Sequence, residues 1–198
     1  MSARLKLGRP AGIDLYLHWS FLLIIAYVIH LYRSAGQGMG SAALGVLLIF
    51  IIFGCVVLHE LGHALMARRF GIPTRDITLF PIGGVARLER MPERPTEELL
   101  VALAGPAVNV AIAIGLTLAI RVAGVYPPET QFEQFLVQIT AVNIFLVVFN
   151  LLPAFPMDGG RALRALLAMR TGRLAATRTA ASIGQAMAIV FGMVGLFI

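Results

Sequence analysis

The residues of this sequence best suited to chemistry are two histidines and a glutamate in the stretch LHELGH, residues 58–63. His59 and His63 are one turn apart on the same face of a helix, so both imidazoles can reach a single ion. Zinc binds imidazole nitrogen at about 2.0–2.1 Å, and catalytic zinc keeps three protein ligands and one open position. Glu60 lies beside the pair and can accept a proton from water. The stretch therefore predicts a zinc site with Glu60 as general base.

A third ligand must come from elsewhere in the chain, and Asp158 is the first candidate. It lies in NLLPAFPMDGG, residues 150–160, just after an apolar run. Pro153 and Pro156 prevent a regular helix there and free backbone groups that need polar partners. Irregular backbone is tolerated at membrane depth where it lines a cavity, and a metal ion and its water belong in such a cavity. His18 remains the alternative ligand.

Cys55 and Asn150 are the other side chains close to these segments. Cys55 precedes His63 by about 12 Å along a helix axis. This is too far for both to bind one ion, so we expect Cys55 to be a packed core residue. Asn150 precedes Pro153 by about one turn and can donate an amide hydrogen bond to a substrate carbonyl. An interhelical hydrogen bond is the alternative role for Asn150.

These residues belong to a chain of 198 residues that is 59% hydrophobic and only 13% charged. A soluble domain is about 45–50% apolar and about 25% charged. A helix needs about 20 apolar residues to cross a bilayer. Five runs approach or exceed this length, at residues 15–32, 42–67, 99–120, 134–157 and 179–198. The sequence therefore predicts an all-α polytopic membrane protein.

The net charge of +6 is distributed by membrane side. Basic residues gather before the first run, between the second and third, and after the fourth, whereas the other two gaps hold only Arg33 and Arg121. This positive-inside pattern predicts a multi-pass protein of the cell membrane whose N-terminus, residues 68–98 and residues 158–178 are cytoplasmic. A nucleic-acid-binding protein would need a basic soluble face, so we expect no nucleic-acid partner.

Residues 71–95 are too polar for a span and too rich in proline and glycine for a long helix. Apolar residues alternate with Thr78, so we interpret residues 77–86 as a short hairpin or small sheet, with Gly83 and Gly84 offering a turn. Such a structure would lie at the cytoplasmic face of the membrane.

Three other segments complete the predicted organisation. Residues 4–19 alternate in a similar way and are expected to add strands to the hairpin. Residues 159–173 form either a short span or a helix at the cytoplasmic surface, and their arginines favour the surface. The chain stops inside an apolar run, which leads us to expect further sequence beyond residue 198. Residues 1–198 are otherwise predicted to be a single membrane-embedded domain.

Two of these segments together resemble the signature regions of the site-2 protease family of intramembrane zinc metalloproteases. They are LHELGHALMARRFGI (58–72) and NLLPAFPMDGGRALRALL (150–167), in the family's order. AGPAVN (104–109) and the glycines of PIGG (81–84) are also similar to family members. We expect AGPAVN to permit close helix packing rather than to contact substrate.

The resemblance covers most of the chain and implies a role for each matching residue. His59, His63 and Asp158 would bind one Zn²⁺ per chain, with Glu60 as the catalytic base. The substrate-binding residues would be Asn150, Gly83 and Gly84. The family core has about six transmembrane helices, whereas the charge pattern indicates five clear ones. Some relatives carry cytoplasmic CBS domains after this core.

The resulting hypothesis is an intramembrane protease that cuts transmembrane segments of single-span regulatory proteins. A helical substrate would be unwound locally and received by an edge strand within residues 77–86. The competing hypothesis is a membrane metal transporter or metal-binding regulator, which would place ionisable groups at several depths. An inactive scaffold is a further alternative, although an intact Glu60 argues against it. The sequence leaves the oligomeric state open.

Overall fold

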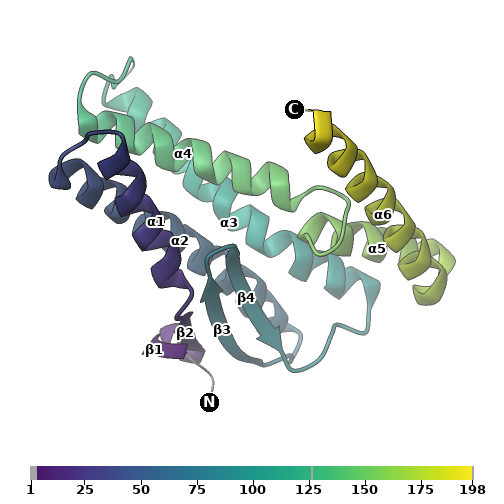
Figure 1. Cartoon of the computed structure of the whole chain (residues 1–198). Helices are drawn as coiled ribbons and strands as arrows, with labels where there is room; N and C mark the ends of the chain where they lie inside the picture. The colour runs from purple at the N-terminus through teal and green to yellow at the C-terminus, as the bar shows by residue number, and fades with distance from the viewer. Residues whose placement is uncertain (1–3, 126, 198) are drawn as a thin grey trace.

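The computed structural model describes residues 4–125 and 127–197 of the chain. Strands and helices alternate along its first half, and helices alone make up its second half (Figure 1). The elements are β1 (Arg4–Gly8), the 3₁₀ turn η1 (Pro10–Gly12), β2 (Asp14–His18), α1 (Phe21–Ser34), α2 (Met39–Arg69), β3 (Thr74–Phe80), β4 (Gly83–Leu88), α3 (Pro95–Val122), α4 (Gln131–Asn150), α5 (Asp158–Thr171) and α6 (Arg173–Phe197).

Four helices in the described residues are long and apolar enough to cross a membrane, namely α2, α3, α4 and α6. They confirm the prediction of a multi-pass helical membrane chain. The remaining two, α1 and α5, have 14 residues each. At 1.5 Å per residue each is about 21 Å long, which is short of the roughly 30 Å hydrocarbon core. The predicted count of about six spans is therefore not reached by length alone.

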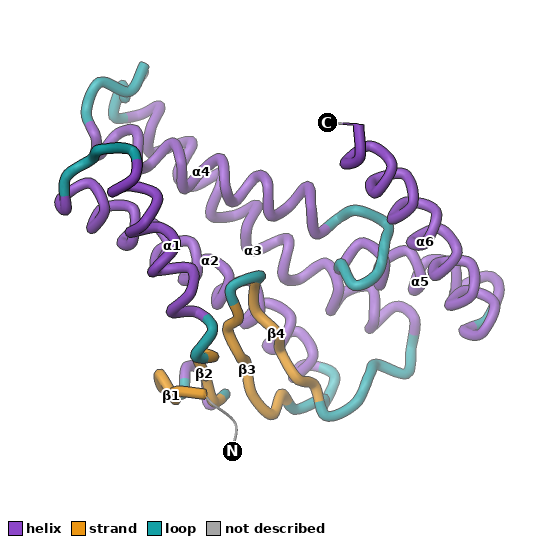
Figure 2. The backbone as a smooth tube through the Cα atoms, in the orientation of Figure 1, coloured by secondary structure: helices purple, strands orange, loops and turns teal. Residues whose placement is uncertain are grey.

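The predicted hairpin and the predicted N-terminal strands join in one four-stranded sheet of order β1-β2-β3-β4 (Figure 2). The β2–β3 pair is parallel, and the other two pairs are antiparallel. The hairpin turn lies at Pro81 and Ile82, so the expectation that Gly83 and Gly84 form it is wrong. Both glycines belong to β4, where Gly83 has φ +138°, a value that favours glycine. β4 is left as an edge strand.

The sheet packs onto the helices through β3, one of its two inner strands. Ile77 and Leu79 of β3 are almost fully buried. Leu79 packs in one apolar cluster with Phe21 of α1 and with Phe53 and Val56 of α2. Because β3 is anchored in this way, the β3–β4 hairpin is held beside α2, which carries the two histidines.

Residues 159–173 fold as most of α5 and the first residue of α6, separated by Gly172 in a left-handed conformation at φ +79°. The arginines of α5 do not all face solvent. Nε of Arg164 donates to Oε1 of Glu98 in α3 at 2.8 Å, and Glu98 is 2% exposed. This buried ion pair packs α5 against α3. The expectation of a helix at the cytoplasmic surface, which was based on its arginines, did not include such a contact.

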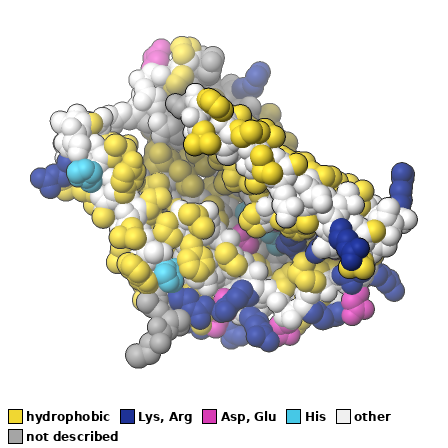
Figure 3. All heavy atoms as spheres, turned by 45° about the vertical axis from the view of Figure 1, so that its right-hand side comes forward, with side chains coloured by type: hydrophobic (Ala, Val, Ile, Leu, Met, Phe, Trp, Pro, Cys, Tyr) yellow, Lys and Arg dark blue, Asp and Glu magenta, His cyan; other side chains and the backbone are white. Residues whose placement is uncertain are grey.

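Charged side chains gather along the lower edge of the molecule in the space-filling view, over the sheet and the α5–α6 connection, below a broad apolar surface (Figure 3). Large apolar side chains are also exposed along α1, α4 and α6. A soluble protein rarely exposes so much contiguous apolar surface. The pattern fits helices that face lipid, with a charged rim on one side of the membrane.

Candidate metal centre

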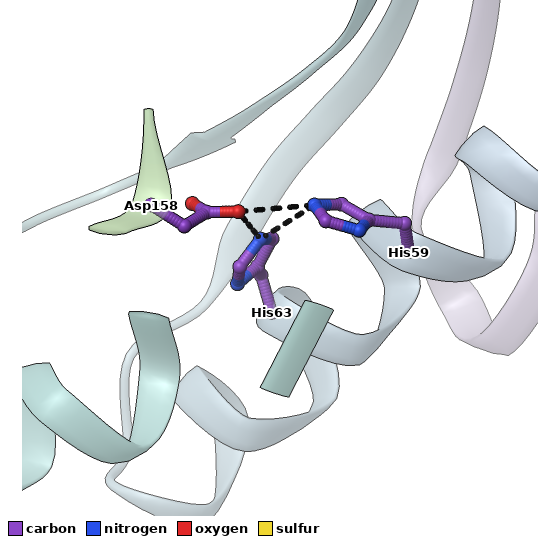
Figure 4. A group of neighbouring side chains, drawn as sticks. All are labelled: His59, His63 and Asp158. Carbon is purple, nitrogen blue, oxygen red and sulfur yellow. Dashed lines mark hydrogen bonds and ion pairs between the residues drawn. The ribbon is translucent and has the colours of Figure 1, made fainter. Parts of the chain in front are cut away.

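Three metal-ligating side chains from distant parts of the chain meet in the interior (Figure 4). His59 and His63 project from α2, and Asp158 is the first residue of α5. Oδ2 of Asp158 lies 3.1 Å from Nε2 of His59 and 3.0 Å from Nε2 of His63, and the two Nε2 atoms are 3.1 Å apart. All three residues are buried. The predicted HELGH pair and the predicted third residue are thus brought together.

The other ring nitrogen of each histidine is already occupied. Nδ1 of His63 lies 2.7 Å from the carbonyl oxygen of Val101 in α3, an atom that can only accept. Nδ1 of His59 bonds Oδ1 of Asn109, whose amide nitrogen donates to Oδ1 of Asn143 at 2.8 Å. Both Nδ1 atoms must therefore carry the proton, which leaves each Nε2 with its lone pair directed at the centre.

This donor set fits a zinc ion. Two Nε2 lone pairs and a carboxylate oxygen face one another, an arrangement that needs a cation to be stable in a buried site. Ligand atoms around tetrahedral zinc are about 3.3 Å apart when the bonds are 2.0–2.1 Å long, close to the 3.0–3.1 Å separations found here. Hydrogen bonds to the distal ring nitrogens are the usual support of metal-bound histidines.

Asp158 reaches the histidines because the chain after α4 is irregular. Residues 151–157 fold into successive turns that contain Pro153 and Pro156, as their sequence predicts. The two glycines after Asp158 are then required for packing. A Cβ on Gly159 would collide with the Leu151 carbonyl, and one on Gly160 would lie 2.6 Å from the Ala154 carbonyl carbon. The DGG sequence thus lets α5 start directly against the irregular loop.

The role of Asn109 and Gly105 was not predicted from the sequence, which assigned AGPAVN only to close packing. Close packing does occur, because a Cβ on Gly105 would fall on the Nε2 atoms of His59 and His63. Asn109 in addition orients His59 and is fully buried with its partner Asn143. Two asparagines within the uncharged runs 99–120 and 134–157 were the available signal, since a buried amide needs a polar partner.

Glu60 is directed towards the sheet rather than towards another helix. The backbone N–H of Ala86 in β4 donates to its Oε2 at 3.1 Å, and a Cβ on Gly84 would lie 2.7 Å from its Cγ. The strand thus holds one carboxylate oxygen in place, and the absence of a side chain at Gly84 leaves room for the carboxylate. Glu60 is not among the three grouped ligands.

A cavity of about 590 Å³ contains this centre. Its lining brings together every residue predicted for the site: His59, Glu60, His63, Gly83, Gly84, Asn150 and Asp158. Asn150 at the end of α4 donates from Nδ2 to the Leu146 carbonyl of its own helix at 2.9 Å, so the interhelical bond considered from the sequence is not seen. The cavity is bordered by the strand on one side and by the irregular loop on the other.

The two other candidate ligands lie outside this group. Nδ1 of His18 is 2.7 Å from Oγ of Ser20, and the His18 ring packs against Phe80 at a centroid distance of 4.9 Å. Cys55 is buried in α2, where its sulfur contacts Nδ2 of Asn143 at 3.4 Å, in keeping with the expected packed position. In the described residues, the group of His59, His63 and Asp158 is the one cluster with metal-ligand geometry.

Known proteins are similar to this chain in sequence and in fold. The chain matches Peptidase family M50 over residues 47–127 and 120–194. It is 36% identical to a zinc metalloprotease of Methanocaldococcus jannaschii over 196 residues, 99% of this chain and 55% of that protein. It is 35% identical to the putative zinc metalloprotease Rip3 of Mycobacterium tuberculosis over 205 residues, 99% and 52% of the two chains.

A solved structure, the site-2 protease from Methanocaldococcus jannaschii, superposes with a TM-score of 0.69 at 36% identity, covering 98% of this chain and 85% of that chain. The chain spans about half the length of the curated relatives it matches.

Proposed function

Because the chain belongs to Peptidase family M50, we propose that it is an intramembrane zinc metalloprotease. Its substrates would be single-span membrane-bound regulatory proteins, cut within their transmembrane segments. The observation that carries this proposal is the common cavity, in which three buried ligand atoms, a carboxylate that is not a ligand and an edge strand lie side by side.

His59, His63 and Asp158 would hold the zinc ion, with Glu60 as catalytic base. Zinc bound there would supply a Lewis acid that polarises a carbonyl oxygen and makes water more acidic. Ala86 occupies Oε2 of Glu60, so Oε1 is the atom left to accept a proton from the attacking water. The same oxygen would return that proton to the amine nitrogen as the C–N bond breaks.

The open edge of β4 would bind the unwound substrate. Main-chain groups of a strand point alternately to its two sides. Because the N–H of Ala86 is turned towards Glu60, the main-chain groups of Gly84 and Leu88 face the same open edge. A substrate segment added there would pass the base and the ligands in an extended form. Gly83, Gly84 and Asn150 are the proposed substrate-binding residues, with Asn150 placed to donate to a substrate carbonyl.

Photocrosslinking tests this binding mode. A substrate carrying a photoreactive residue near its cleavage site should crosslink to β4. The strand at the opposite edge, β1, is the matched control, and crosslinking to β1 in place of β4 would show that the substrate binds elsewhere.

The charged rim supports one orientation of the protein in the membrane. We infer that the N-terminus, the sheet and the mouth of the cavity are cytoplasmic, and that α1 and α5 complete a set of about six membrane-embedded helices. The basic residues around the sheet support this orientation through the positive-inside rule. A single cysteine at Met91 should react with an impermeant thiol reagent only from the cytoplasmic side, and one at Gln37 only from the opposite side. Reversed labelling would contradict the orientation.

A metal transporter is less well supported. Transport would need ligands at several depths along a path, whereas one cluster is found in the part of the chain that is described. The direct test is incubation of the purified protein with candidate single-span substrates, with and without a chelator. Cleavage that stops on chelation and returns with zinc supports the proposal, and chelator-resistant cleavage contradicts it.

A further inference from the structure

A second cavity, of about 580 Å³, continues from the first along β4 and is rich in arginine. It is lined by Arg75, Ala86, Arg87, Leu88, Glu89, Met91 and Arg161. Ala86, Leu88 and Arg161 line both cavities. The second cavity is called the basic cleft below. Its position along the same strand means that an extended chain leaving the metal centre would enter it next.

Arg161 of the basic cleft lies beside the proposed metal ligand Asp158, and its donors are largely unused. Nη1 lies 3.8 Å from Oδ1 of Asp158, whereas Nε and Nη2 are buried and have no hydrogen-bond partner in the described structure. Nε and Nη2 form one edge of the guanidinium, the edge that binds a carboxylate through two parallel hydrogen bonds. Unsatisfied buried donors are costly. Because both atoms are enclosed, an anionic partner reaches this edge when the Arg161 side chain turns towards the cleft.

The other charged side chains leave the cleft positive. Arg75 is exposed and has no acidic partner among the ion pairs of the described residues. Arg87 is held by Asp76, which offsets its charge. Glu89 is the acidic residue of the lining. The charge of Arg75 is therefore uncompensated, and that of Arg161 is only partly compensated by Asp158. The positive potential that they create in the cleft favours a carboxylate as ligand.

We propose that the basic cleft binds an acidic side chain of the substrate on the cytoplasmic side of the scissile bond. This assignment rests on the proposed function. Ala86 is level with Glu60, and Leu88 and Glu89 follow it by two and three positions. Since an extended chain advances about 3.3 Å per residue, the acidic residue lies about two to four positions from the bond that is cut.

This charge would separate substrates from ordinary membrane proteins. Most transmembrane segments carry lysine or arginine on their cytoplasmic flank. A basic flank would meet Arg75 and Arg161 with like charge, and such a repulsive contact is an effective way to reject a wrong partner. An acidic flank is favoured by the same two residues. The cleft therefore selects substrates by an acidic cytoplasmic flank rather than by the apolar sequence of the transmembrane segment.

Three model substrates test the assignment. They differ only at one position of the cytoplasmic flank, which is glutamate, glutamine or lysine. The protein is placed in phosphatidylcholine nanodiscs. We expect kcat/KM to fall in that order, by about tenfold or more from glutamate to lysine, as for the loss of a hydrogen bond to a charged group. Arg75→Glu should remove or reverse this order. The matched control Arg170→Glu changes the same charge on an exposed residue outside the cleft and should preserve it.

The Glu60→Gln variant should bind the same three peptides without cleaving them. Fluorescence anisotropy then measures whether their affinities fall in the order glutamate, glutamine, lysine. Chelator-sensitive cleavage of the glutamine substrate reports the proposed function alone, so the two hypotheses fail separately. Equal binding of the three peptides would overturn the assignment. The variant Arg75→Cys tests for a lipid site. If phosphatidylglycerol in the nanodiscs protected its thiol from labelling while the three peptides bound equally, the cleft would bind lipid and the assignment would also be wrong.

Discussion

Two buried polar groups hold α5 against the rest of the protein, and they are built in opposite ways. At the start of the helix, Asp158 faces His59 and His63, and all three present lone pairs. Further along the same helix, Arg164 donates to Glu98, so a cation meets an anion directly. The second pair is complete within the protein. The first is complete only when a cation lies between its members.

The difference shows how a binding site can be told from a structural contact. A buried ion pair whose partners satisfy each other stabilises one arrangement of helices and needs no ligand. A cluster of acceptors held rigid by outer hydrogen bonds, such as those of Asn109 and Val101, costs free energy unless a metal ion is bound.

The largest effect is expected at the ligands. Asp158→Ala should remove stoichiometric zinc from the purified protein, because two imidazoles on one helix are left without the third ligand. Metal content by mass spectrometry checks this. Asp76→Ala removes a carboxylate outside the cavity and should keep its zinc. A full zinc content in Asp158→Ala would exclude Asp158 as a ligand.

A large loss of stability, without loss of zinc, is expected at the ion pair. Glu98→Leu leaves the Arg164 guanidinium without its partner, and breaking such a pair costs about 3–5 kcal/mol. The double variant Glu98→Leu with Arg164→Met should recover most of this loss, since no charge is then left unpaired. Denaturant titration in detergent measures both. Equal destabilisation of the single and double variants would be inconsistent with this account.

A smaller effect is expected from the residue behind His59. Asn109→Ala removes the acceptor that orients the ring, and changes of this kind lower metal affinity by about 10–100-fold. Competition with a zinc-binding dye measures the affinity. Asn109→Asp keeps the acceptor and should lose less. Thr117→Ala, whose hydroxyl bonds only the Ala113 carbonyl of the same helix, is the control and should bind zinc normally.

The smallest effect is expected in the sheet. Hydrogen bonds from the Arg87 guanidinium hold the pKa of the Asp76 carboxyl below its ordinary value, against burial, which raises it. A lowered pKa in the folded state gives stability that is complete above the unfolded pKa of about 3.9 and is lost as the pH falls further.

The stability difference between wild type and Arg87→Met should therefore be constant from about pH 7 to 5 and shrink below about pH 4. It should stay under about 1 kcal/mol, because the Arg87 side chain is 52% exposed. Unfolding curves across this pH range measure it. A difference that grows in acid would contradict the assigned role of Asp76.

The side chains of the metal centre could largely be predicted from the sequence. His59, Glu60 and His63 were identifiable because helical spacing fixes their common face, and Asp158 because two prolines precede it in an apolar run. His59, His63 and Asp158 meet in one cluster, and Glu60 lines the same cavity. Their roles as ligands and base stay predictions. Short-range spacing and the cost of polar groups in lipid were sufficient for these four residues.

Residues that act through long-range contacts could not be placed in this way. The sequence positions of Asn109 and Asn143 do not indicate which helix each side chain will face. Likewise, the Glu98–Arg164 pair joins positions 66 residues apart. The position of the hairpin turn was missed for a related reason. Gly83 and Gly84 are turn residues by propensity, but the register of β4 on β3 and the contact with Glu60 place them in the strand.

One variant tests most directly whether Glu60 is the catalytic base rather than a metal ligand. Glu60→Gln keeps the size of the side chain and an acceptor for the Ala86 N–H, but removes the basic carboxylate. The measurement is cleavage of a single-span substrate by the zinc-loaded variant. We expect one zinc per chain, normal folding, and a cleavage rate lower by about 10²–10⁴-fold, as for the loss of general-base catalysis. Cleavage at a near wild-type rate by that zinc-loaded variant would contradict this role of Glu60.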